Sequence, residues 1–154
     1  MALLAGCASF PESHASRKPK SNEQPQSFAE RKRDAVQAFE RQRDAAQVQA
    51  AINHWQRGDV QKSVTMLEAI IERVPSDVNA RLRLAEVLTS QENFAATEIQ
   101  LRECLVHAPD SAEVHHVLGM LLGESPGREQ EAQAYLRRAS ELEPENELYA
   151  ASAG

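Results

Sequence analysis

Few side chains in this sequence have a type and spacing that could support chemistry. Cys104 lies within an apolar helical pattern, where a free thiol acts as a small hydrophobic group and not as a nucleophile. Glu113 and His116 share one face of a helix, but a carboxylate-bridged metal site needs a second copy of such a pair. His115 and His116 are adjacent and point to different sides of a helix. No phosphate-binding glycine loop or nucleophile elbow occurs, so we expect no enzyme activity, no metal site and no cofactor.

The other cysteine stands near the start of the chain, in Leu4-Ala5-Gly6-Cys7. These residues resemble the lipobox of bacterial lipoproteins, in which the cysteine is acylated and becomes the first residue of the mature chain. The resemblance implies lipidation of Cys7, with acyl chains such as palmitate tethering the protein to a membrane. Ala8 is not the aspartate that retains such proteins in the inner membrane, so an outer-membrane position facing the periplasm is implied. Only six residues precede Cys7, fewer than a signal peptide has, and the resemblance would be complete if the true start lay upstream of Met1. The alternative is a cytoplasmic protein with an apolar start.

Charge divides the chain into two parts. Residues 1–43 carry a net charge of +3 and residues 44–154 a net charge of −9, which together give the overall −6. An acidic second part makes nucleic acid an unsuitable partner. No run of about eighteen apolar residues occurs, so the sequence predicts no transmembrane helix.

The first forty residues change character at Ser27. Residues 8–26 are rich in Ser, Pro, Lys, Glu and Gln, with Phe10 their only large apolar residue, and they predict a disordered linker. Ser27 with Glu30 three residues later has the pattern of a capping box, which predicts that a helix begins there and covers 27–43. No Pro or Gly interrupts the chain until Gly58, which allows one long helix or two helices that meet near Asp44.

A repeat organises the remainder of the chain. Pro75, Pro109 and Pro144 follow apolar helical segments at intervals of 34 and 35 residues. At each of three fixed distances before these prolines, the three copies hold residues of similar type. Twelve residues before lie the small residues Ser63, Thr97 and Ala132, eight before lie Leu67, Leu101 and Leu136, and five before lie Ile70, Cys104 and Ala139.

This pattern resembles the tetratricopeptide repeat (TPR) family over about residues 44–146. The resemblance implies an all-α fold of three helix-turn-helix units, at 44–77, 78–111 and 112–146, in a short right-handed superhelix. Residues 147–154 predict the start of a capping helix, with Leu148 or Tyr149 packed over the last pair. The family's small first-helix residue is matched by Ala51, Ala85 and Gly119. Its first-helix aromatic is replaced by Gln47, Arg81 and His115.

In TPR proteins a groove lined by the first helices binds a peptide or a partner helix. Mapped onto this sequence, the groove residues are Val48, Ile52, Trp55, Gln56, Asn79, Leu82, Glu86, Thr89, Glu113, His116 and Met120. Some TPR proteins hold a terminal carboxylate with Lys, Arg and Asn, but the matching places here are Val48, Ile52, Glu113 and Val117, so no carboxylate-clamp ligand is expected. The groove suits an amphipathic or extended protein segment with apolar and basic residues. Alternatively, Val48, Ile52 and Trp55 share a stripe that packs against the 27–43 helix.

The sequence thus predicts a non-catalytic protein-interaction scaffold, tethered in the bacterial envelope and assisting assembly of a surface or secretion complex. One alternative is a cytoplasmic TPR adaptor. Another is a helical oligomerisation module with Phe28, Val36 and Phe39 as its seam.

Overall fold

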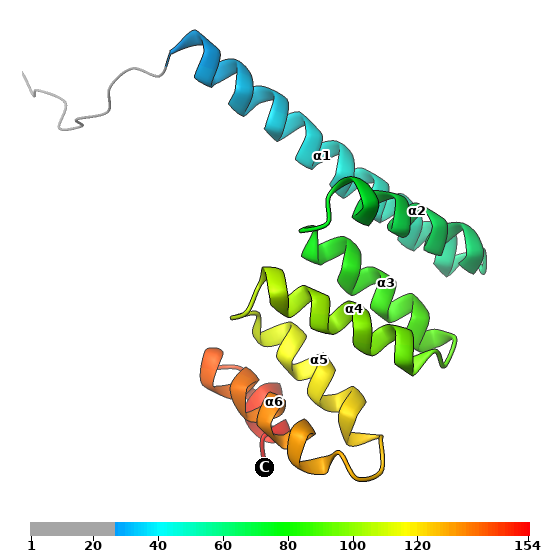
Figure 1. Ribbon diagram of the computed structural model, residues 1–154, viewed down its shortest axis with the longest axis vertical. Coiled ribbons are helices and arrows are strands. Elements are labelled where there is room, and N and C mark those ends of the chain that lie inside the picture. Colours follow the sequence, from blue (N-terminus) through cyan, green and yellow to red (C-terminus); the bar gives the residue numbers. More distant parts are fainter. Residues whose placement is uncertain (1–26) are drawn as a thin grey trace, which may run out of the picture.

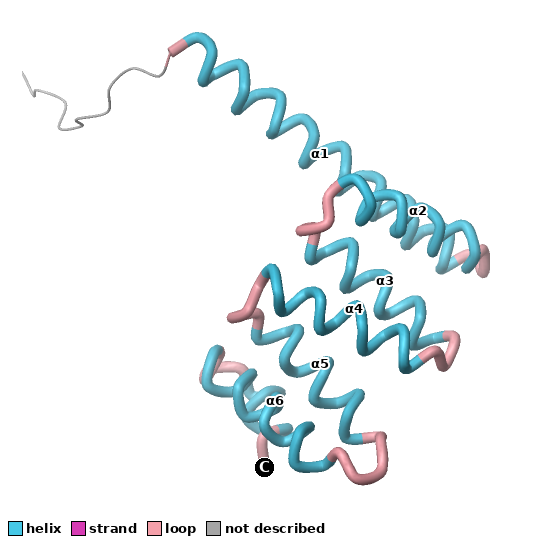
Figure 2. Tube along the Cα trace, viewed as in Figure 1, coloured by secondary structure: helices cyan, strands magenta, loops and turns pink. Residues whose placement is uncertain are grey.

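The computed structural model describes residues 27–154, and every regular element in that range is an α-helix (Figures 1 and 2). The predicted linker at 8–26 and the lipobox-like residues up to Cys7 lie outside the described residues. Within residues 27–154, seven helices follow one another; the first six form three antiparallel pairs and the short seventh packs on the last pair, which confirms the predicted all-α fold of TPR-like units. The helices are α1 Phe28–Gln56, α2 Val60–Arg73, α3 Val78–Ser90, α4 Phe94–His107, α5 Ala112–Gly123, α6 Glu129–Leu142 and α7 Glu147–Ser152.

The residues after each repeat proline start the next helix. Asp77, Ser111 and Asn146 each stand two residues after a proline, and each side chain accepts a hydrogen bond from a backbone N–H in the first turn of α3, α5 or α7. Such caps satisfy donors that have no partner within the helix. The proline and the polar cap therefore act together to end one pair and begin the next.

Small residues allow the two helices of a pair to approach. Ser63, Thr97 and Ala132 are all buried, as the repeat predicts for the crossing of the helices. At Gly119 in α5, a Cβ atom would stand 2.7 Å from Leu136 Cγ and 3.0 Å from the backbone nitrogen of Leu136 in α6. Glycine is therefore required at this contact, because no side chain fits between the helices.

Two main clusters of aliphatic residues form the core. The first joins α1, α2 and α3 through residues such as Ala51 and Leu67, and the second joins α3, α4, α5 and α6 through residues such as Leu101 and Leu118. A small third cluster holds α7, with Tyr149 buried and Leu148 exposed. The repeat residues Ala51, Leu67 and Leu101 are buried, and so are Leu84 and Leu118. Leu136 is only half-buried.

An ion-pair network joins the second pair of helices to the third. Glu98 of α4 accepts hydrogen bonds from Arg128, at 2.7 and 2.9 Å, and from Arg102, at 2.9 Å. Both arginines also pair with Glu131 of α6. These bonds, led by those from Arg128, lower the pKa of Glu98 to about 2, so its carboxylate stays charged across the neutral and mildly acidic range.

The first helix is continuous through Asp44. Of the two arrangements that the sequence allows, the structure has the single long helix, α1, and the predicted boundary between 43 and 44 falls inside it. Only its second half packs against α2 and α3. The first half projects beyond the stack, and all residues from 27 to 42 are exposed (Figure 1).

Candidate protein-binding groove

The residues assigned to the groove differ widely in exposure. They all lie on α1, α3 and α5, the first helices of the three pairs, as the repeat requires. Gln56, Asn79, Thr89, Glu113 and Met120 are exposed, and Ile52, Trp55, Glu86 and His116 are half-buried, whereas Val48 and Leu82 are buried.

Val48 and Leu82 belong to the core. Their side chains are only 3% and 7% exposed, and each is a member of one of the two main clusters. A residue at this depth offers a ligand almost no surface. The two residues therefore support the first helices from within, and the accessible part of the surface is smaller than the sequence alone implies.

Ile52 and Trp55 form the apolar surface at the α1 end. Both are half-buried and pack against the cluster that contains Leu67 and Val87. The residues from 28 to 43 do not cover them, since that segment continues in line with the second half of the same helix. At the other end of the stack, Met120 of α5 is 48% exposed.

Polar groups lie between these apolar ends. Glu86 and Arg83 of α3 lie one turn apart and form an ion pair. The positive charge of Arg83, in the middle of the surface, is therefore already balanced by Glu86. The hydroxyl of Thr89 donates to the carbonyl of Ala85, 2.8 Å away. Glu113 of α5 is exposed. The polar part of the groove is thus weakly acidic.

His116 contacts the last helix. Its Nε2 lies 3.1 Å from the hydroxyl of Ser152, and its ring lies against Tyr149, with 4.8 Å between the ring centres. Burial lowers the pKa of His116, which keeps the imidazole neutral at pH 7. No group of three or more His, Cys, Asp or Glu residues that could hold a metal ion occurs among residues 27–154. His116 is therefore an anchor for α7 as well as a groove residue.

Two of the residues that replace the family's first-helix aromatic, Arg81 and His115, make hydrogen bonds that the sequence does not predict. Arg81 Nε donates to the carbonyl of Pro75 at 2.9 Å, and His115 Nε2 lies 2.8 Å from the carbonyl of Pro109. Both side chains are 9% exposed. Each fastens a first helix to the turn that precedes it. The recurrence of a polar residue six positions after a proline is the sequence signal that marks them.

Cys104 is a core residue. It is fully buried in α4, and burial raises the pKa of its thiol to about 11. A thiol with that pKa is almost wholly protonated at neutral pH and is a poor nucleophile.

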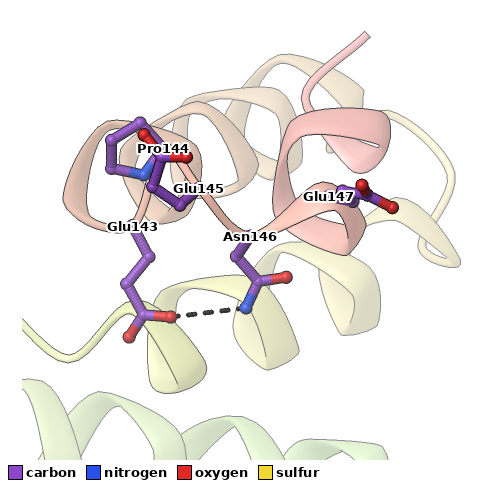
Figure 3. Close-up of a pocket in the computed structure, with 5 residues that line it drawn as sticks. All are labelled: Glu143, Pro144, Glu145, Asn146 and Glu147. Atoms are coloured by element: carbon purple, nitrogen blue, oxygen red, sulfur yellow. Dashed lines mark hydrogen bonds between the residues drawn. The ribbon is translucent and has the colours of Figure 1, made fainter.

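The depression drawn in Figure 3 is formed by one turn, between α6 and α7. Five consecutive residues line it, from Glu143 to Glu147, and Asn146 Nδ2 donates to the carboxylate of Glu143 at 3.3 Å. Asn146 also caps α7. The depression is wide open, and its polar groups serve the turn, so we assign no ligand to it. No helix among the described residues is long and apolar enough to cross a membrane.

The fold belongs to the class of TPR-like helical repeats. The first TPR domain of Spaghetti (RPAP3), bound to an HSP90 peptide, has a TM-score of 0.64 and 14% identity, with 73% of this chain and 88% of that chain covered. The Yersinia enterocolitica type III secretion chaperone SycD, in complex with a peptide of the translocator YopD, has a TM-score of 0.63, 15% identity and coverages of 71% and 88%. MamA from Desulfovibrio magneticus RS-1 has a TM-score of 0.58, 22% identity and coverages of 69% and 59%. No family model and no curated protein matches the sequence. At these identities the likeness shows the fold alone.

Proposed function

We propose that this protein is a non-catalytic scaffold that binds a segment of another protein on the face formed by α1, α3 and α5. One observation carries the proposal: apolar side chains remain accessible at both ends of that face, with Trp55 half-buried on α1 and Met120 48% exposed on α5. Similar folds in RPAP3 and SycD were solved with bound peptides. Accessible aromatic and apolar side chains on a rigid helical face are the usual anchors of such contacts.

The groove favours an apolar and basic segment. Ile52, Trp55 and Met120 supply apolar contacts, and Glu113 supplies an exposed carboxylate. The places at which a carboxylate clamp would need Lys, Arg or Asn hold Val48, Ile52, Glu113 and Val117. We therefore expect that an acidic peptide such as SRMEEVD, the HSP90 peptide bound in the RPAP3 structure, is not a ligand of this groove.

Trp55→Ala tests the groove. Basic amphipathic peptides would be selected from a display library on the wild-type chain, and their affinities compared by fluorescence or calorimetry. We expect Trp55→Ala to weaken binding by at least about tenfold, since aromatic anchors dominate binding energy. Phe94→Ala is the matched control. Phe94 is also an accessible aromatic residue, 52% exposed, but it lies on α4, which contributes no residue to the groove.

Stability must be followed in the same variants. Trp55 packs against the core as well as facing solvent, so a modest decrease in melting temperature is compatible with the proposal. Binding is compared at a temperature at which all variants are folded. Equal loss of binding in both variants, or loss that tracks unfolding alone, would assign Trp55 to the core and remove the proposed groove.

Membrane tethering is the second part of the proposal and rests on the sequence. Lipidation of Cys7 would place the scaffold on the outer membrane, facing the periplasm, with residues 8–26 as the tether. There it would assist assembly of a surface or secretion complex, a role compatible with the secretion chaperone that has a similar fold.

Cys7→Ser tests the tether. In a bacterial host, the chain with its native upstream sequence should incorporate labelled fatty acid and sediment with membranes, whereas Cys7→Ser should remain soluble. Equal partitioning of both forms would support a cytoplasmic adaptor.

A further inference from the structure

The projecting half of α1 is an unpartnered helix with an apolar stripe. Phe28 is 78% exposed, Phe39 67% and Val36 49%, although large apolar side chains elsewhere in the helix are wholly or half buried. An isolated helix of this length is marginal in water, because most helical stability comes from packing of one face. Residues 8–26 offer only Phe10 as a large apolar side chain, which is too little to cover the stripe.

The stripe has the period of a two-stranded coiled coil. The residues on it alternate by four and three positions, and all of them are exposed: Phe28, Lys32, Ala35, Phe39, Gln42 and Ala46. The flanking positions hold Ala29, Val36, Ala38 and Ala45, with Arg31 and Arg43 nearby. The remaining charged residues of the segment, Glu30, Arg33, Asp34, Glu40 and Arg41, lie on the opposite side. A surface of this composition is suited to another helix.

We propose that this stripe pairs with the same stripe of a second copy of the chain, in antiparallel orientation. A single register matches every layer: Phe28 faces Ala46 of the second copy, Ala35 faces Phe39, and Lys32 faces Gln42. Each large side chain then lies opposite a small one, as close helix packing requires. The Lys32 ammonium donates to the Gln42 side-chain carbonyl, so the polar layers are satisfied and fix the register.

The parallel alternative fits poorly. It places Lys32 against Lys32 and Phe28 against Phe28, while Ala35 faces Ala35 and leaves a gap. Like charges in a helix seam are destabilising, and the gap forfeits packing. The antiparallel pair avoids both defects with the same residues.

The buried area predicts a weak dimer. Complete burial of a phenylalanine side chain removes about 150–250 Å² of surface from water. Phe28 and Phe39 of the two copies make four such side chains, and at their present exposure they contribute roughly 400–700 Å². Alanine, Val36 and the Lys and Gln stems add to this, which places the interface near the lower limit of about 1,200 Å² for specific complexes. Residues 28–43 carry five basic and three acidic side chains, so two copies repel weakly. Salt should therefore strengthen the dimer, whereas it would weaken the binding of an acidic foreign partner.

Self-pairing leaves the proposed groove free. None of the stripe residues is a groove residue, and two copies joined through α1 would present two grooves at once. A partner with two binding segments would then gain affinity by avidity.

Sedimentation velocity on the full chain carrying Cys7→Ser tests the pairing. We expect reversible, concentration-dependent dimers that strengthen in high salt. Phe39→Glu should raise the dissociation constant by at least about tenfold, since it places a charge in the apolar seam. Gln37→Glu is the matched control on the opposite side of the helix and should dimerise like the parent. Circular dichroism checks that both variants keep the helix. A parent chain that stays monomeric at its highest soluble concentration overturns the proposal, as does equal weakening by both substitutions.

Disulfide trapping tests the orientation. One chain carries Lys32→Cys and another Gln42→Cys, both with Cys7→Ser, while the native Cys104 remains buried. On mixing and mild oxidation, the antiparallel register predicts a covalent heterodimer between the two chains. Rapid homodimerisation of the Lys32→Cys chain alone would show parallel pairing and contradict the proposed register. Neither result depends on the groove, so this proposal and the proposed function can fail separately.

Discussion

The two halves of α1 belong to one helix and have different surroundings. In the half from 44 to 56, Val48 and Ala51 are 3% and 0% exposed, because α2 and α3 pack against them. In the half from 28 to 43, Phe28 and Phe39 are 78% and 67% exposed. Helix formation in the first half depends on local features: the capping box of Ser27 and Glu30, and the absence of Gly and Pro. The comparison shows one continuous helix in two environments: tertiary packing within the monomer stabilises residues 44–56, whereas only local features stabilise residues 28–43 within the monomer.

The largest expected effect is the difference in stability lost when a large apolar side chain is truncated in the core that packs on the second half of α1 or on the exposed first half. Leu67 is fully buried and belongs to the cluster that packs against α1. Leu67→Ala is expected to lower the free energy of unfolding by about 2–5 kcal/mol, because it removes apolar contacts and leaves a cavity. Phe39→Ala removes a larger side chain but should change the stability of the monomer by less than about 0.5 kcal/mol.

Urea denaturation of dilute protein measures both variants. Comparable losses for Leu67→Ala and Phe39→Ala would contradict the difference in packing. Such a result would mean that the first half of α1 is covered within the monomer.

The packed half was largely predictable from the sequence. The three prolines and the small residues at Ser63, Thr97 and Ala132 fix the helix pairs, because close crossing and a turn after each pair leave little choice of residue. The continuity of α1 through Asp44 was not decided by the sequence. Local propensity permits either a straight helix or a turn there, and the structure has the straight one, in which Asp44 pairs with Arg73 of α2.

The candidate groove was harder to predict. The repeat assigns Val48 and Leu82 to the groove by position, but whether such a position is accessible depends on how closely successive first helices approach, and here both are buried. The roles of Arg81 and His115 can also be recognised only from the three-dimensional structure. Their hydrogen bonds end on backbone carbonyls of Pro75 and Pro109, and a propensity scale contains no information on such partners.

Asp44 lies where the two halves of α1 meet. Its substitution should lower the free energy of unfolding by less than Leu67→Ala and by more than Phe39→Ala. Its carboxylate accepts hydrogen bonds from Arg43 at 3.0 Å and from Arg73, the last residue of α2, at 2.6 Å. These bonds, with that from Arg43 the largest contribution, hold the pKa of Asp44 below its ordinary value near 3.8. Asp44→Asn should therefore cost about 1 kcal/mol at neutral pH, a modest value because the arginines are partly exposed to solvent.

The pH dependence of stability distinguishes this ion pair from simple packing. A carboxyl group whose pKa is lower in the folded state stabilises the fold above its unfolded pKa and loses that contribution as the pH falls below it. The wild-type chain should therefore lose more stability than Asp44→Asn between pH 5 and pH 3. Parallel pH profiles for the two proteins would show that Asp44 contributes no ion-pair stabilisation.

The smallest effect expected comes from the same substitution made once in each half of α1. Gln37 and Gln49 are both exposed, and both are more than one turn from either end of the helix. Glycine costs a helix interior about 0.5–1 kcal/mol relative to such residues, through backbone entropy. Gln49→Gly should lower global stability by that amount, because residues 44–56 unfold together with the core. Gln37→Gly should leave global unfolding unchanged and instead increase amide hydrogen exchange in residues 28–37, since that segment can fray without opening the stack. A global loss of stability from Gln37→Gly in dilute protein would show that the projecting half is coupled to the core after all.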